Sequence, residues 1–488
     1  MKILRHTIYN AAGAAAPIIV SLATVPLYLS VVGLERYGLL SICWLLLGYF
    51  GLFDLGLGRA TTHRLASLRS GPAGERSRVF WSSIGLTLIL SIGACMIFVP
   101  LAALGLGWIK LSSMSLEAEI WSALPWLAAC LPLAMINGVL SGSLAARDKF
   151  LDLNMINALG AVLMAVMPLA AALLIEPRLD MLVAASFAAR AFSAVLLFAR
   201  CAGAVPLQRP RLSDRGDIVT LAKYGGWVTV ISAAEPLLTL WDRAAVGAVL
   251  GAASVAHYVV PFNLVIQARI LPASLSGALF PKLSGGEKEA IAGSSRVAQR
   301  ALSGVMTPVI LVASIIIGPF LTLWIGPEMA AKSAPIAYLL LPGIWAHSLV
   351  HVPAASILAQ GRPDRIARLH LAELVPYALL LYFCMKMLGL PGVALAWSVR
   401  CIVDALLVFA LSGEPLRELR ALIFPFSLIC GAVAACLADP VPSLLLGVIA
   451  LAGIIYAVRI LYPAVAGHLA AVRSAVAAAR EGGIGEGL

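Results

Sequence analysis

The chain has 488 residues, of which 61% are hydrophobic and only 12% are charged, against roughly 25% charged residues in an ordinary soluble domain. A soluble fold of this length would need more polar surface, and a disordered or fibrous chain would be less hydrophobic, so the composition predicts an all-α polytopic membrane protein. In such a protein a net charge of +11 is explained by basic cytoplasmic loops, so nucleic-acid binding is not expected.

Fourteen stretches of the sequence are apolar and approach the roughly 20 residues that a helix needs to cross the hydrocarbon core. The first is interpreted as a retained helix, because the apolar run that begins near Ile8 is too long for the core of a cleavable signal peptide. Prolines inside several stretches, such as Pro125 and Pro308, are tolerated in membrane helices. The predicted spans lie approximately at 8–32, 37–62, 80–107, 120–143, 154–175, 181–205, 223–249, 255–282, 301–325, 335–358, 370–387, 392–412, 421–438 and 443–462.

Basic residues are distributed unevenly between the two sides of these spans. Since cytoplasmic loops carry an excess of Lys and Arg, the side with most of them is predicted to be cytoplasmic, and an even number of spans places both termini there. The loops are short, so no folded domain outside the membrane is expected. The opposite side has only five basic residues, Arg36, Lys110, Arg178, Lys332 and Lys386.

The polar and basic segment 206–221 lies near mid-chain and is predicted to link two halves. Arg190 and Arg400, each followed by a Leu-Leu pair, recur at a separation similar to that of Gly33 and Gly251. Motifs that recur at similar separations indicate two structural repeats related by an axis along the membrane normal. The predicted domains are an N-terminal six-helix bundle at 1–205, the linker at 206–221, a C-terminal six-helix bundle at 222–413, and two extra helices with a cytoplasmic tail at 414–488.

Several ionisable residues are predicted to lie at bilayer depth, where a charge costs at least about 2.5–3.5 kcal/mol and usually faces protein or a water-filled cavity. Arginine provides planar donors that suit phosphate and carboxylate groups. Arginines from several helices therefore predict a cavity for an anionic group such as a pyrophosphate, and the buried acids are candidates for coupling to H⁺ or Na⁺ or for charge pairing. The residues are Arg59, Arg190, Arg243, Arg269 and Arg400, with Asp54, Glu235, Asp242 and Asp404.

Structural explanations stay open for some of these charges. Arg400 and Asp404 stand at i and i+4 of one predicted helix, so they can neutralise each other. Arg59 is close enough to the inner interface to snorkel. Arg190 and Arg269 have no acid close to them in the sequence, so a cavity position is the stronger interpretation for these two.

The sequence contains no motif for catalysis or nucleotide hydrolysis. Walker A, GxSxG and HExxH patterns are absent, and the eight cysteines form no CxxC pair. His347 and His351 have the spacing of metal ligands but no third ligand nearby, so positions in the core or along a pore are expected. The protein is therefore predicted not to be an enzyme and to use no metal or organic cofactor.

Two sets of motifs carry a family resemblance. The stretch from Asn10 to Ala66 contains V-P-L-Y from Val25, G-x-x-x-Y-G from Gly33, and D-L-G-L-G-R from Asp54 to Arg59. The second set comprises Asp242-Arg243 with V-G-x-x-L-G (Val246 to Gly251), the segment Leu271 to Ser284, and L-T-L-W-I-G-P (Leu321 to Pro327). Together these motifs resemble the Wzx-type polysaccharide flippases of the multidrug/oligosaccharidyl-lipid/polysaccharide exporter superfamily.

The resemblance implies two six-helix bundles around a central cavity, two extra helices, and transport by alternating access. The implied substrate is an undecaprenyl-pyrophosphate-linked oligosaccharide that moves from the cytoplasmic to the periplasmic leaflet of a bacterial inner membrane. It would serve O-antigen or exopolysaccharide synthesis. The implied partners are this lipid-linked oligosaccharide and membrane lipids, with a polysaccharide polymerase and a chain-length regulator as further candidates. Arg59, Arg243 and Arg269 are the first candidates for substrate contact, followed by Arg190 and Arg400.

Three alternatives stay open. A cation-coupled drug antiporter of the same superfamily would have an acid-dominated cavity, which the deep arginines disfavour. A membrane polysaccharide polymerase would be an enzyme with a large periplasmic loop, which the chain lacks. A peptidoglycan-precursor flippase shares the superfamily and the topology, and the sequence does not separate it from a polysaccharide flippase.

Overall fold

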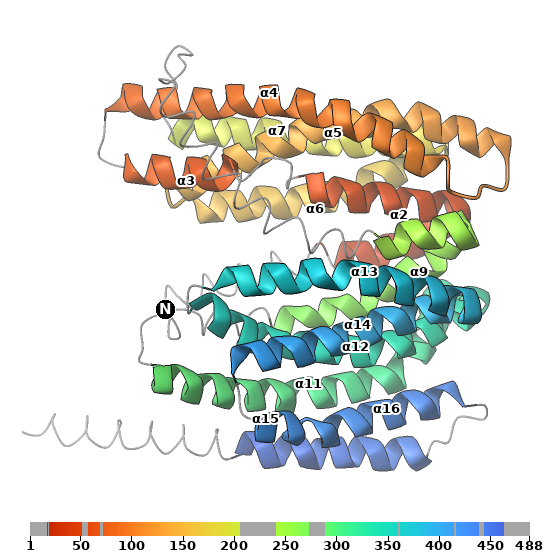
Figure 1. The fold of residues 1–488 in the computed structure, drawn as a ribbon. Helices are drawn as coiled ribbons and strands as arrows, with labels where there is room; N and C mark the ends of the chain where they lie inside the picture. Colours follow the sequence, from red (N-terminus) through yellow and green to blue (C-terminus); the bar gives the residue numbers. More distant parts are fainter. Residues whose placement is uncertain are drawn as a thin grey trace, which may run out of the picture. The chain divides into compact units, whose positions relative to one another are not determined.

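The computed structural model describes residues 17, 19–50, 57–68, 72–204, 241–272, 288–359, 362–413, 416–438 and 444–462. Every regular element in these ranges is a helix, as the sequence predicted. The chain divides into two compact units, Met1–Val260 and Pro261–Leu488, which we call the N-terminal and the C-terminal unit. Figure 1 shows the helices coloured along the sequence.

The N-terminal unit is organised around α5. Its helices are α2 (Leu34–Tyr49), α3 (Leu57–Ser67), α4 (Ala73–Leu106), α5 (Met114–Ala145), α6 (Phe150–Leu174), α7 (Leu179–Ala204) and α9 (Ala252–Val265), which continues past the boundary. Residues 19–31 and 241–250 are also helical. Half of the apolar span of α5 is buried against α3, α4 and α7, whereas only 17% of the α4 span is buried, and α4, α5 and α7 lie side by side in Figure 1. Leu140 and Leu144 of α5 pack there against Phe80 and Leu197.

The C-terminal unit is organised around α12. Its elements are the short 3₁₀ helix η2 (Ile266–Arg269), α11 (Lys288–Ile325), α12 (Pro327–Ala359), α13 (Pro363–Leu388), α14 (Leu390–Ser412), α15 (Leu416–Ala421) and α16 (Ile423–Leu437). A further helix covers Leu444–Tyr462. The central helix α12 packs against α11, α13, α14 and α16, and 72% of its apolar span is buried.

Within the described ranges, 10 helices are long and apolar enough to cross a membrane, and Ile19–Val31 is a shorter apolar helix. These ten correspond to ten of the predicted spans, so the chain is a multi-pass membrane protein. The four other predicted spans, at 8–32, 37–62, 223–249 and 255–282, fall partly outside the described residues.

Several helices begin well before the apolar stretch that predicted them. The helix α11 begins at Lys288 rather than at 301, and α12 begins at Pro327 rather than at 335. Hydropathy marks only the part of a helix inside the hydrocarbon core, whereas the helical backbone satisfies its own hydrogen bonds and can continue into the polar interface. The extension of α11 carries Arg300, which forms an ion pair with Glu418 of α15 at 2.8 Å.

The two glycines of the predicted repeat have similar positive φ angles. Gly33, with φ 84°, directly precedes α2, and Gly251, with φ 90°, directly precedes α9. Because residues with a side chain rarely adopt such φ values, glycine is the residue suited to both turns. The predicted domain boundaries at 205, 222 and 413 stay predictions, and the linker at 206–221 lies outside the described residues.

Candidate functional sites

A polar pocket of about 520 Å³ lies within the N-terminal unit, between α2, α5, α6 and α7. Its polar lining includes Arg190 and Ser193 on α7, Asn157 on α6, Asn137 on α5 and Trp44 on α2. The structure therefore places Arg190 on the wall of a cavity rather than in a charge pair.

The guanidinium group of Arg190 is only partly satisfied by the protein. Its Nη2 donates a hydrogen bond to the backbone oxygen of Leu47 at 2.7 Å, near the end of α2, where the last carbonyl groups have no partner within the helix. Its buried Nε has no hydrogen-bond partner among the described residues, and neither has Oδ1 of Asn137. Because buried polar atoms are costly to leave unsatisfied, the pocket suits a polar ligand, or water, that supplies the missing partners.

Trp44, which lines the pocket, belongs to an aromatic cluster whose other members are buried. The indole Nε1 of Trp44 donates to Oγ of Ser186 at 3.2 Å, and its ring meets Tyr28 and Tyr37 edge-on at 5.4 Å and 6.4 Å between ring centres. The hydroxyl group of Tyr28 donates to the backbone oxygen of Ala165 at 2.8 Å. These contacts fix a flat apolar surface beside amide and guanidinium groups, and this combination can bind a sugar ring through both its apolar face and its hydroxyl groups.

A cluster of ionisable side chains lies within the C-terminal unit, between α13 and α14. Arg400 of α14 donates from Nε to Oε2 of Glu373 on α13 at 3.3 Å, and its guanidinium carbon lies 5.7 Å from the ring centre of Tyr377. Nε2 of His370 lies 3.7 Å from Oδ1 of Asp404. The sequence left open whether Arg400 and Asp404 neutralise each other, and the structure brings each of them to a partner on α13.

The two acids of this cluster are almost completely buried. Glu373 is 7% exposed and Asp404 is 1% exposed, and their carboxyl groups lie within hydrogen-bonding reach of each other. Oε1 of Glu373 has no hydrogen-bond donor among the described residues. Two carboxyl groups can hydrogen-bond each other only when one of them carries a proton, so this arrangement suits a shared proton.

Other charged or titratable groups surround the cluster. His347 and His351 of α12 lie with their ring centres 5.7 Å apart, and Nδ1 of His351 is 3.2 Å from the backbone oxygen of His347. Arg269, half-buried on η2, lies close enough to His347 and Cys401 to interact with both electrostatically. In the part of the chain that the structure describes, no group of three His, Cys, Asp or Glu residues is placed to hold a metal ion.

Asp242 and Arg243, a predicted pair of charges, are buried within the N-terminal unit. Oδ2 of Asp242 accepts a hydrogen bond from the hydroxyl group of Tyr258 on α9 at 2.7 Å, and its Oδ1 accepts from the backbone N–H of Arg243 at 2.6 Å. Asp242 therefore connects the helical segment 241–250 to α9.

Three predicted site residues are not placed by the structure. Asp54 and Glu235 lie outside the described residues, and Arg59 is described only as part of α3, without its side chain. Their roles stay predictions.

The sequence reasoning missed several buried acids, among them Glu373 and Glu119, which contact arginines of other helices. Glu373 is the only acid within the predicted span 370–387, so a systematic search of each span would have found it. Glu119 directly precedes the predicted span 120–143, yet its side chain is buried, with 5% of the residue exposed. It pairs with Arg36 of α2 at 2.7 Å and accepts from the backbone N–H of Leu179, the first residue of α7, at 2.9 Å.

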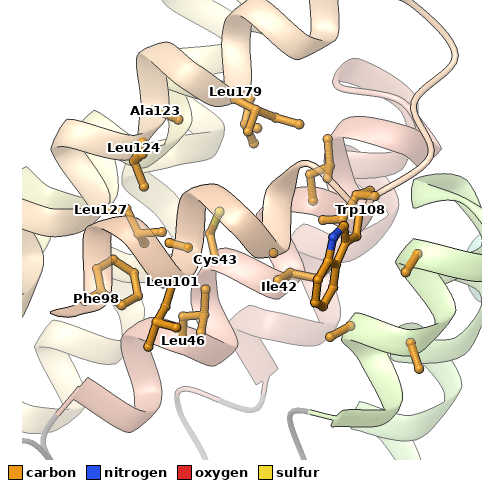
Figure 2. A pocket seen from close by; sticks show the side chains of 18 of the residues that line it. Ile42, Cys43, Leu46, Phe98, Leu101, Trp108, Ala123, Leu124, Leu127 and Leu179 are labelled. Atoms are coloured by element: carbon orange, nitrogen blue, oxygen red, sulfur yellow. The ribbon is translucent and has the colours of Figure 1, made fainter.

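A second pocket of the N-terminal unit, of about 460 Å³, is almost entirely apolar. Its walls come from α2, α4, α5 and the helical segment 241–250. Figure 2 shows side chains of these elements around it, among them Ile42, Leu46, Phe98, Leu101 and Leu127.

Comparison with known proteins gives concordant results. Residues 3–286 match a family described as polysaccharide biosynthesis protein. A protein of Shigella flexneri named "Putative O-antigen transporter" is 28% identical over 409 residues, which cover 84% of this chain and 97% of that protein.

Two solved structures illustrate the similarity in fold. The lipid II flippase MurJ in an inward closed conformation has a TM-score of 0.72 at 12% identity, covering 94% of this chain and 100% of its own. An inward-facing multidrug resistance transporter of the MATE family and the MOP superfamily has a TM-score of 0.66 at 15% identity, covering 84% and 98%. At such identities these structures bear on the fold alone, and they confirm the predicted all-α polytopic membrane fold.

Proposed function

The chain belongs to the polysaccharide biosynthesis protein family, and on this basis we propose that it is a flippase for a lipid-linked oligosaccharide in the bacterial inner membrane. The substrate is an oligosaccharide joined to undecaprenyl pyrophosphate, which moves from the cytoplasmic to the periplasmic leaflet for O-antigen or exopolysaccharide synthesis. The likeness to the Shigella flexneri protein supports this substrate class. The activity is transport, with no covalent chemistry on the substrate.

The observation that carries the proposal is the polar pocket of the N-terminal unit. It combines the partly unsatisfied guanidinium group of Arg190 with amide groups and the indole of Trp44. A sugar headgroup linked through pyrophosphate presents hydroxyl groups, apolar ring faces and negative charge. The pocket offers a partner to each of these.

The contacts of Arg190 and Arg400 assign different roles to these two deep arginines. Arg190 is the first candidate for substrate contact, because it lines the pocket. Arg269, Arg243 and Arg59 keep their proposed substrate role. Arg400 is proposed to be a pairing residue, because its guanidinium is engaged by Glu373 and Tyr377.

The ionisable cluster of the C-terminal unit is the proposed site of coupling to a proton. Glu373 and Asp404 lie side by side, Arg400 hydrogen-bonds one of them, and His370 faces the other. Two carboxylates sharing one site favour holding a proton, and imidazole is a proton acceptor near neutral pH. A proton is therefore the coupling ion that this set of groups suits best, ahead of Na⁺.

Alternating access is the transport mechanism that fits the fold, since solved transporters of this fold are found in inward closed and inward-facing conformations. In the proposed topology both termini lie in the cytoplasm, as the distribution of basic residues indicates. A polysaccharide polymerase and a chain-length regulator are the proposed partners on the periplasmic side.

The proposed function is tested by replacing Arg190 with alanine in cells that depend on this protein for surface polysaccharide. Output should fall strongly at an unchanged protein level. The matched control is Arg200→Ala on the same helix, because the side chain of Arg200 is 65% exposed and lies 3.7 Å from Asp152; this variant should keep normal output. Equal output from both variants would contradict the assigned role of the pocket.

A further inference from the structure

The apolar pocket of the N-terminal unit has the size and lining of a site for a hydrocarbon chain. Its volume of about 460 Å³ falls within the range of roughly 300–1,000 Å³ that is typical of small-molecule pockets. Figure 2 shows Leu46 of α2 next to Leu101 of α4, with Phe98 and Leu127 at one side of the pocket and Ile42 at the other. Because this lining is almost entirely apolar, an apolar occupant fits the pocket better than water or a polar ligand.

The pocket opens onto the lipid-facing surface of the protein. Leu101, on the rim, is 62% exposed, and the rim residues Trp108 and Trp241 are 71% and 54% exposed. In a membrane-spanning helix such as α4, of which only 17% of the apolar span is buried, exposed apolar side chains face lipid chains. The pocket is therefore continuous with the bilayer, and its occupant enters from there.

One end of the pocket is polar. Ile109, which lines it, is followed by Lys110, whose Nζ donates to the backbone oxygen of Val249 at 3.1 Å. Lys110 is exposed, and no carboxylate lies within ion-pair distance of it among the described residues. Glu35, the acid beside this loop, accepts hydrogen bonds from the backbone N–H and the hydroxyl group of Ser112. The ammonium group of Lys110 at the outer end of the pocket suits the negatively charged head of a lipid, and the apolar walls suit its hydrocarbon chain.

We propose that this pocket holds the isoprenoid chain of the carrier lipid, with the phosphate end of the lipid beside Lys110. The inference rests on the proposed function, which supplies a polyprenyl chain as part of the substrate. Because Lys110 lies on the predicted periplasmic side, the pocket would hold the chain in the outer leaflet, where the transported lipid leaves the protein.

The experiment uses a polyprenyl phosphate with a photoreactive diazirine in its chain, added to the full-length protein in lipid vesicles. Crosslinks should map by mass spectrometry to residues 98–109 and should decrease when unlabelled polyprenyl phosphate competes. A phospholipid with a diazirine in its acyl chain serves as the second probe. If the phospholipid crosslinks at these residues equally well and polyprenyl phosphate does not displace it, the pocket is an ordinary lipid contact and the proposal is wrong.

A matched pair of variants tests whether the pocket itself is the site. Ala102→Phe fills the pocket, whereas Ala103→Phe places the same ring on the neighbouring, equally half-buried position of α4 that does not line it. Crosslinking should fall about tenfold, which corresponds to about 1.4 kcal/mol, in the first variant only. Ala244→Phe, at an exposed position that lines the opposite wall, should give the same loss if Ala102→Phe proves unstable. Undiminished crosslinking in a folded pocket-filling variant would overturn the proposal.

Failure of the pocket and failure of the proposed function give different results in these experiments. Competed crosslinking without any transport of lipid-linked sugar would support the pocket and contradict the function. Transport without crosslinking in the pocket would support the function and contradict this inference.

Discussion

Replacing Arg400 with methionine is expected to destabilise the protein strongly, because its guanidinium group belongs to a buried ion pair. The side chain of Arg400 is 10% exposed and that of Glu373 is 8% exposed, with 3.3 Å between Nε and Oε2. Methionine retains much of the volume, but it removes the donor to Glu373 and leaves this carboxyl group beside Asp404. Removing one partner of a buried ion pair costs about 3–5 kcal/mol.

The double variant Glu373→Gln/Arg400→Met separates the loss of the pair from the loss of packing. Residues in direct contact show coupling energies of about 0.5–3 kcal/mol, so the double variant should be more stable than Arg400→Met alone. Free energies of unfolding would be measured by SDS titration in mixed micelles. The control is Arg368→Met, since Arg368 is 80% exposed and its partner Asp364 is 53% exposed, and a surface pair contributes about 0–1 kcal/mol. Strictly additive effects of the two cluster substitutions would refute the pairing.

Three further outcomes are expected. Glu373→Gln should abolish transport driven by an imposed pH gradient, whereas transport down a substrate gradient should continue. Transport that still responds to the pH gradient in this variant would rule out the proposed proton site. Tyr258→Phe should lower the free energy of unfolding by about 1–3 kcal/mol, because it removes the donor to buried Asp242, and an unchanged unfolding curve would show that this bond contributes nothing. Glu119→Gln should lower the free energy of unfolding by about 1–2 kcal/mol, because it weakens the hydrogen bonds of this side chain to Arg36 and to the N-terminus of α7. An unchanged free energy of unfolding would argue against this network.

The membrane class and most spans could be predicted because they depend on composition and on hydropathy, which are properties of the sequence itself. The ends of the helices could not. The polar first turns of α11, from Lys288, remain helical although hydropathy stops marking the span. A helix in the polar interface is stabilised by its own hydrogen bonds and by contacts such as Arg300 to Glu418, which join segments far apart in the sequence.

The candidate sites were predicted in part. Arg190 has no acid close to it in the sequence, and in the structure it lines the polar pocket of the N-terminal unit, but its contact with substrate stays a prediction. For Arg400 and Asp404, sequence spacing suggested a pair within one helix, because only neighbours along a helix can be recognised without the fold. The partners Glu373 and His370 lie on α13, and their identification required the packing of α13 against α14.

The central claim, that this protein moves lipid-linked oligosaccharide between leaflets, is tested most directly in vesicles that contain the purified protein. Undecaprenyl-pyrophosphate-linked oligosaccharide would be incorporated into both leaflets, and the fraction accessible to an added glycan-cleaving enzyme would be followed over time. The account predicts that the protein makes the inner-leaflet pool accessible and that Arg190→Ala slows this exchange while Arg200→Ala does not. An inner-leaflet pool that stays protected with the native protein, under a pH gradient of either direction, would contradict the account.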